Sequence, residues 1–66
     1  MQVQVNGEML ELRDGITLTE LIAQLALGEK RIAVELNLEI IPRSEHESTV
    51  LKAADRVEIV HAIGGG

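Results

Sequence analysis

One short segment of the chain has the repeat of an amphipathic helix, and strand-like segments flank it on both sides. Its apolar side chains recur at intervals of three and four residues, which places them on one face of a helix. They are Leu18, Leu21, Ile22 and Leu25. A lone helix cannot bury such a face by itself. In a chain of 66 residues, we expect a sheet made from the flanking segments to cover it.

The residues around this segment carry the signals that begin and end a helix. Thr17 and Glu20 have the spacing of a capping box, in which each side chain bonds to the backbone of the other. Ile16 and Leu21 are spaced to form a hydrophobic staple across that cap. Gly28 is a natural stop, because glycine readily takes the left-handed conformation that ends helices. The sequence therefore predicts one helix between Thr17 and Gly28.

The segment before the helix reads as a hairpin. Val3 and Val5 alternate with polar residues, as in a half-buried strand. Asn6-Gly7 follows, a dipeptide that suits a tight turn because both residues tolerate positive φ angles. Leu10 and Leu12 then mark a second strand.

After the helix, alternation predicts a third strand over residues 32–37, and residues 38–41 either continue it or form a short fourth strand ended by Pro42. Residues 44–51 are polar and mixed, and we expect an irregular connection with a helical turn. The last strand starts at Asp55, with Val57 and Ile59 on one face and Glu58 and Val60 on the other. This order predicts an α+β fold of the β-grasp type, a mixed sheet with one main helix packed across one face, as a single domain over residues 1–66.

Composition excludes several kinds of function. The net charge is −5 and the chain has no aromatic residue, so a nucleic-acid partner is not expected. The absence of cysteine excludes disulfides, thiolate metal sites and cysteine chemistry, and we predict no metal site. No stretch suits a signal peptide or a membrane span, which predicts a cytoplasmic protein. No large apolar patch is evident, so we expect a monomer.

Conventional catalytic sets are missing from the sequence. There is no P-loop motif, and Ser44, Glu45 and His46 are adjacent residues that rarely converge as a nucleophile and its base. We interpret His46 as a solvated loop histidine and His61 as a partly buried residue at a strand end, with contact to a partner as the alternative. The chain is therefore not expected to be an enzyme.

The C-terminal residues Gly64, Gly65 and Gly66 are the feature that chemistry could use. A tail without side chains is thin enough to enter a narrow active site, although a frayed terminus is the plain alternative. A terminal carboxylate, with a pKa of about 3.5, is ionised and a poor electrophile. If the tail is used, a separate enzyme must activate the carboxylate, for example by adenylation with ATP.

A second hypothesis concerns the surface that leads to this tail. By alternation, Val60 and Ala62 face solvent together with Glu58, and Ile63 follows them. An apolar strip of Val60, Ala62 and Ile63 would suit docking of a partner that acts on the flexible tail over residues 64–66.

These features together resemble the ThiS family, the ubiquitin-like sulfur carriers of thiamine biosynthesis. The resemblance extends over the whole chain, and its motifs are Asn6-Gly7-Glu8, Ala33-Val34-Glu35 with Asn37, Ile41-Pro42-Arg43-Ser44, Thr49-Val50-Leu51-Lys52, Asp55-Arg56-Val57-Glu58-Ile59-Val60 and Ile63-Gly64-Gly65-Gly66. Leu38 and Ala54 depart from it, because relatives often have glycine at both positions.

The resemblance implies a specific chemistry. A ubiquitin-activating-like adenylyltransferase would adenylate the Gly66 carboxylate with ATP and magnesium, so the carrier itself would bind no cofactor. A persulfide donor, loaded by a cysteine desulfurase, would convert the carboxylate to a thiocarboxylate, and thiazole synthase would take the sulfur. The small subunit of molybdopterin synthase, a ubiquitin-like protein modifier and a plain interaction module remain as alternatives.

Overall fold

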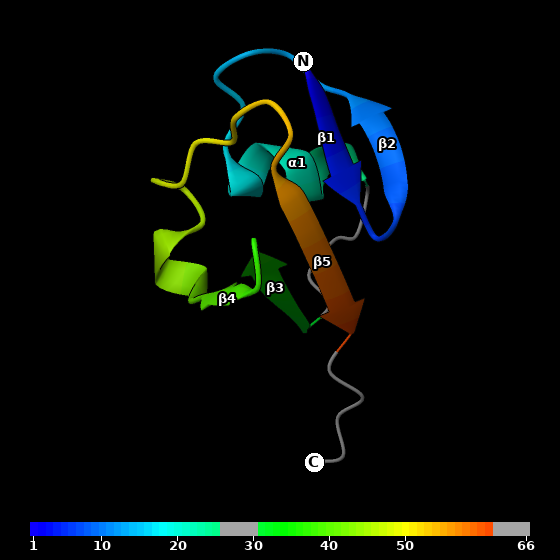
Figure 1. Ribbon diagram of the computed structural model, residues 1–66. Coiled ribbons are helices and arrows are strands. Elements are labelled where there is room, and N and C mark those ends of the chain that lie inside the picture. Colours follow the sequence, from blue (N-terminus) through cyan, green and yellow to red (C-terminus); the bar gives the residue numbers. More distant parts are fainter. Residues whose placement is uncertain (26–30, 62–66) are drawn as a thin grey trace.

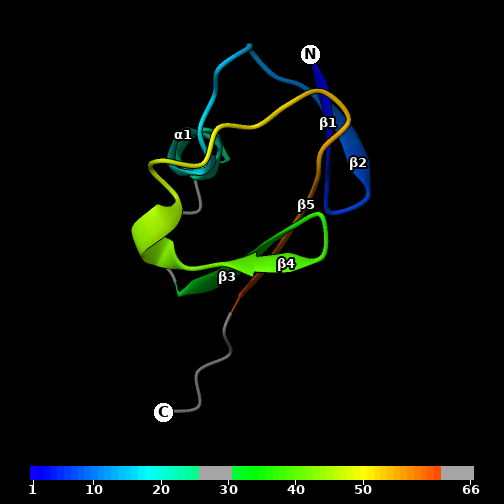
Figure 2. The same cartoon turned by 60° about the vertical axis from the view of Figure 1, so that its left-hand side comes forward.

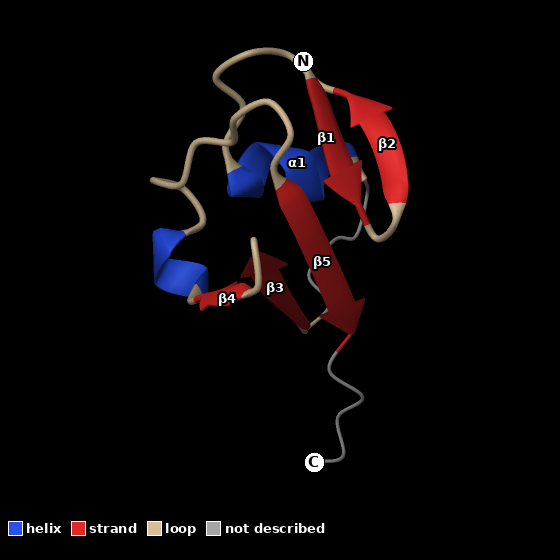
Figure 3. Cartoon of the chain, viewed as in Figure 1, coloured by secondary structure: helices blue, strands red, loops and turns tan. Residues whose placement is uncertain are grey.

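The computed structural model describes residues 1–25 and 31–61. Within these residues, one α-helix packs against one face of a five-stranded sheet (Figures 1 and 3). The strands are β1 (Gln2–Val5), β2 (Glu8–Glu11), β3 (Ile32–Leu36), β4 (Glu39–Ile41) and β5 (Arg56–His61), the helix is α1 (Leu18–Gln24), and a short 3-10 helix spans Arg43–Glu45. The predicted α+β class, with a mixed sheet and one main helix, is confirmed.

The first and last strands lie side by side in the middle of the sheet. The strand order is β2-β1-β5-β3-β4, and β1 and β5 run parallel while the other neighbours are antiparallel. Figure 1 shows β1 and β5 pointing the same way. A parallel pair needs a long crossover connection, and here that connection includes α1.

The core lies between the sheet and the helix. Leu18 and Leu21 of α1 are fully buried, and Figure 2 shows the helix nearly end-on beside the sheet that they face. Ile22 and Leu25, the other two residues of the predicted stripe, are partly buried against the same core. The ten apolar residues that are buried within residues 1–25 and 31–61 are all aliphatic: Val3, Val5, Leu12, Ile16, Leu18, Leu21, Val34, Leu51, Val57 and Ile59.

The predicted capping box begins the helix. The Thr17 Oγ1 accepts a hydrogen bond from the Glu20 N–H at 3.2 Å, and the Glu20 Oε1 accepts one from the Thr17 N–H at 3.0 Å. The bond from the Thr17 backbone is the main cause that lowers the pKa of Glu20, and Arg13 adds to it. The described helix ends at Gln24, earlier than the predicted stop at Gly28, which lies outside the described residues.

Both hairpin turns between the described strands use the left-handed backbone conformation. Asn6 and Gly7 have φ angles of 49° and 85° and join β1 to β2 as predicted. Asn37 and Leu38 have φ angles of 50° and 72° and join β3 to β4 in the same way. Residues 39–41 therefore form a separate fourth strand and do not continue the third.

Leu38 and Ala54, the two departures from glycine, both have a positive φ. Ala54 has a φ of 71° in the turn before β5. A side chain with a Cβ pays roughly 1–2 kcal/mol for this conformation. The neighbouring turns are tied together, since the Asn37 Nδ2 donates to the Asp55 Oδ1 at 3.1 Å and the Asn37 Oδ1 accepts from the Arg56 N–H at 2.9 Å.

We predict that Leu38→Gly and Ala54→Gly each stabilise the protein. Glycine removes the left-handed strain, but its greater backbone entropy in the unfolded chain offsets part of the gain, so each change should raise the free energy of unfolding by about 0.5–1 kcal/mol. Ala53→Gly is the matched control, because Ala53 is exposed like Ala54 and has no positive φ. Urea unfolding measures all three. If Ala54→Gly is no more stable than Ala53→Gly, the turn carries no strain.

Candidate functional site

The strand that leads to the predicted reactive tail is an interior strand of the sheet. Strand β5 lies between β1 and β3 and ends at His61. The predicted site residues Ala62, Ile63, Gly64, Gly65 and Gly66 lie outside the described residues. Of the predicted site, the structure therefore places Val60 and the strand on which the tail begins.

The two faces of β5 separate as the sequence predicts. Val57 and Ile59 point into the core and are 0% and 7% exposed. Val60 lies on the opposite face, called here the outer face because α1 does not cover it, and is 57% exposed. Its partner across the ladder is Ala33 of β3, which is also exposed. Val60 is thus free to contact another molecule at the end of the sheet where β5 stops.

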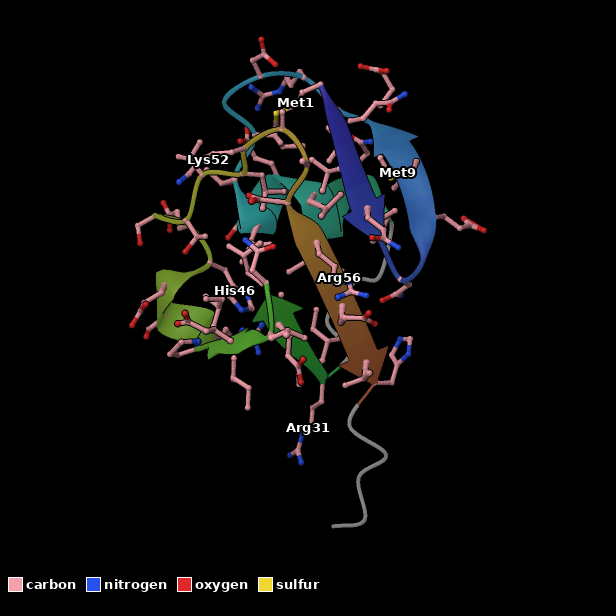
Figure 4. The ribbon with its side chains drawn as sticks, viewed as in Figure 1. Met1, Met9, Arg31, His46, Lys52 and Arg56 are labelled. Atoms are coloured by element: carbon pink, nitrogen blue, oxygen red, sulfur yellow. The ribbon has the colours of Figure 1, made fainter. Side chains whose placement is uncertain are left out.

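Two further apolar side chains on the outer face were not predicted. Ile40 pairs with Glu35 across β3 and β4, and Met9 pairs with Gln4 across β1 and β2. By strand alternation both point to the outer face, and they are 73% and 56% exposed. Figure 4 shows Met9 on β2. The alternation of residues within each hairpin could have indicated that Ile40 and Met9 are exposed. That they share one face with Val60 follows only from the strand order.

Two carboxylates lie between the apolar residues of this face. Glu35 and Glu58 are directly opposite each other in the β3–β5 ladder, and both are half-buried. Like charges in such a pair destabilise a sheet. Within residues 1–25 and 31–61, the ion pairs involve the Met1 amino group and Arg13, and neither Glu35 nor Glu58 takes part in one. A cation on a docked molecule would relieve this repulsion.

The interpretation of His46 as a solvated loop residue is wrong. The side chain is buried, and its Nε2 donates a hydrogen bond to the Ile41 backbone carbonyl oxygen at 3.0 Å. His46 follows directly after the 3-10 helix, and Figure 4 shows it beside that helix. Its own carbonyl accepts a hydrogen bond from the Thr19 N–H at 3.3 Å. His46 therefore connects the 3-10 segment to β4 and α1.

His61 is exposed, and the interpretation of it as partly buried is also wrong. It lines an open cleft of about 330 Å³, together with Glu8 of β2 and Leu25 at the end of α1.

Among the described residues, no three histidine, aspartate or glutamate side chains are grouped to hold a metal ion. No helix within residues 1–25 and 31–61 is long and apolar enough to cross a membrane.

Comparison with known proteins identifies the family. The sequence matches the ThiS family over residues 3–66, which includes the three terminal glycines. The chain belongs to the ThiS family. The sulfur carrier protein ThiS of Bacillus subtilis is 37% identical to it over 65 residues, which cover 97% of this chain and 98% of that protein.

A solved structure of a ThiS protein has the same fold. The crystal structure of the thiamine biosynthesis protein ThiS from Geobacter metallireducens superposes with a TM-score of 0.87 at 32% sequence identity, and each chain is covered completely. The predicted ubiquitin-like β-grasp fold is thereby confirmed.

Some relatives of this ThiS-family chain are much longer. The thiazole synthases of Paramagnetospirillum magneticum and Magnetococcus marinus are each 36% identical to it over 66 residues. The match covers the whole chain but only 20% of either protein, so this chain spans about a fifth of their length. In these two proteins, a ThiS-like region and further sequence form one polypeptide.

Proposed function

We propose that this chain is the sulfur carrier for thiazole formation in thiamine biosynthesis, acting in the cytoplasm through the carboxylate of Gly66. The observation that supports this most strongly is the match to the ThiS family through residue 66, the position where the chemistry would occur. The 37% identity to the Bacillus subtilis sulfur carrier protein ThiS, over 97% of this chain, also supports the proposal. In this role the chain is a reagent and not a catalyst.

The proposed chemistry begins with activation of the carboxylate. A carboxylate oxygen of Gly66 attacks the α-phosphorus of ATP in a partner related to ubiquitin-activating enzymes, and magnesium pyrophosphate leaves. The terminal sulfur of a persulfide, supplied through a cysteine desulfurase, then attacks the acyl carbon and AMP leaves. A thiol cleaves the resulting S–S bond and becomes a disulfide, which leaves a thiocarboxylate on Gly66. Thiazole synthase takes this sulfur, and the carboxylate is restored.

The tail composition suits each of these steps. Gly64 and Gly65 carry no side chain beside the reacting carbonyl, so they can follow the carboxylate into a narrow active site. The sequence has no P-loop motif, which supports placing ATP and magnesium on the partner. We therefore propose that the carrier holds no cofactor of its own.

Docking would use the outer face, with Val60, Ala62 and Ile63 next to the tail. The exposure of Val60 supports this role, and Ile40 and Met9 are also exposed on the same face. Glu35 and Glu58, which form no ion pair within residues 1–25 and 31–61, favour a partner that presents a cation. The thiazole synthases that include a ThiS-like region support thiazole synthase as one such partner.

We predict that Gly66 gains one sulfur atom. The untagged chain is incubated with its adenylating enzyme, ATP, magnesium and a persulfide donor, and its intact mass is measured. The expected gain equals one oxygen replaced by sulfur, localised to Gly66, and a chain lacking Gly66 should show none. No gain, with the enzyme active on another carrier, would contradict the proposal. A conjugate of much higher mass would instead indicate a protein modifier.

We predict that Val60→Asp weakens docking. If Val60 is covered by the partner, the aspartate places an unpaired charge in that contact, and a cost of about 1.4 kcal/mol would raise the KM for the carrier in adenylation about tenfold. Val50→Asp is the matched control, because Val50 is 50% exposed but pairs with Thr17 beside α1, away from the outer face. Equal KM values for the two variants would exclude Val60 from the docking surface.

A further inference from the structure

Strand β5 loses one of its two neighbours shortly before the tail begins. The parallel strand β1 pairs with it at only two positions, Gln4 with Arg56 and Val5 with Val57. On the other side, β3 continues to pair with it as far as Ile32 and His61. The last four residues of β5, residues 58–61, therefore have a strand partner on one side only.

A side chain continues the bonding where β1 stops. The Asn6 Oδ1 accepts a hydrogen bond from the Ile59 N–H at 2.7 Å, between residues 53 positions apart in the sequence. The Asn6 N–H donates to the Val57 carbonyl at 2.9 Å, so this residue bonds β5 through both its backbone and its side chain. Its φ of 49° belongs to the hairpin turn that ends β1. The side-chain carbonyl thus replaces the backbone carbonyl that a longer β1 would supply.

We propose that Asn6 is a positioning residue, which fixes the end of β5 from which the chain continues to Gly66. This inference rests on the proposed function of the tail. Gly66 is the fifth residue after His61, and a chain of five residues spans at most about 18 Å. Ordering that end before docking lowers the entropy lost when a partner binds the tail.

The chain contains a matched residue at the other end of the same strand. Asn37 has a φ of 50°, begins the two-residue turn between β3 and β4, and accepts from the Arg56 N–H at 2.9 Å through its Oδ1. Asn6 and Asn37 therefore make the same kind of bond to β5, one near the tail and one at the start of the strand. Only Asn6 should affect presentation of Gly66.

Three variants separate positioning from general stability. Asn6→Gly keeps a residue suited to positive φ but removes the acceptor, whereas Asn6→Asp keeps both the acceptor and tolerance of that φ. Asn37→Gly removes the equivalent acceptor at the far end of β5. In adenylation by the partner enzyme, we expect Asn6→Gly to raise the KM for the carrier about fivefold with kcat nearly unchanged, the effect of losing one hydrogen bond. Asn6→Asp and Asn37→Gly should stay within about twofold of the wild type.

Amide hydrogen exchange of the isolated chain provides a readout that needs no partner. In Asn6→Gly the amides of Ile59, which loses its acceptor, and of Val60, the next residue of the strand end, should exchange faster than in the wild type, and in Asn37→Gly they should not. Equal exchange of these amides in the two glycine variants would overturn the proposal, as would an equal rise in KM. If the wild-type chain is not adenylated at all, the proposed function fails, and the exchange result still decides whether Asn6 holds the end of β5.

Discussion

The parallel pairing of β1 with β5 is the contact on which the rest of the structure depends. It joins the two ends of the described chain in the middle of the sheet and places Val3, Val5, Val57 and Ile59 side by side beneath α1. With no cysteine and no aromatic residue, this aliphatic layer must supply the stability that larger side chains or disulfides give other small domains. The same pairing makes the first half of the last strand an interior part of the sheet, while residues 58–61 continue with β3 alone as strand partner.

Under the proposed function, the reacting group is the Gly66 carboxylate, and the folded domain serves to carry it. The core, the capped helix and the left-handed turns build a support, and under the proposed function the chemistry takes place beyond it at Gly66. Under the same proposal, the outer face around Val60, near the end of the described strand, is the surface that partners would contact. Beyond the end of β1, strand β5 has a strand partner on one side only. On the other side, the Asn6 side chain accepts a hydrogen bond from the Ile59 N–H.

Features set by neighbouring residues could be predicted from the sequence. The capping box of Thr17 and Glu20 and the turn at Asn6-Gly7 are local, and the structure contains both. The alternation of Val57 and Ile59 with Val60 also gave the correct faces, because a strand has a fixed period of two residues. These features need no knowledge of the rest of the fold.

Features that depend on distant segments could not be predicted. The burial of His46 depends on the Ile41 carbonyl, and the common face of Ile40, Met9 and Val60 depends on the strand order. Leu38 and Ala54 adopt left-handed conformations against the preference of their own side chains, since the surrounding turns require them. Of the candidate site, Val60 was placed as predicted, while the roles of Gly64, Gly65 and Gly66 stay predictions.

The most direct test of the central claim follows labelled sulfur into the product. The chain is loaded with an isotopically labelled thiocarboxylate at Gly66 and mixed with thiazole synthase and the remaining thiazole precursors, with no other sulfur source. The account predicts that the label appears in the thiazole, with one sulfur delivered per carrier and the Gly66 carboxylate restored. Label that stays on the carrier, under conditions in which another loaded ThiS protein delivers its label to thiazole, would contradict it.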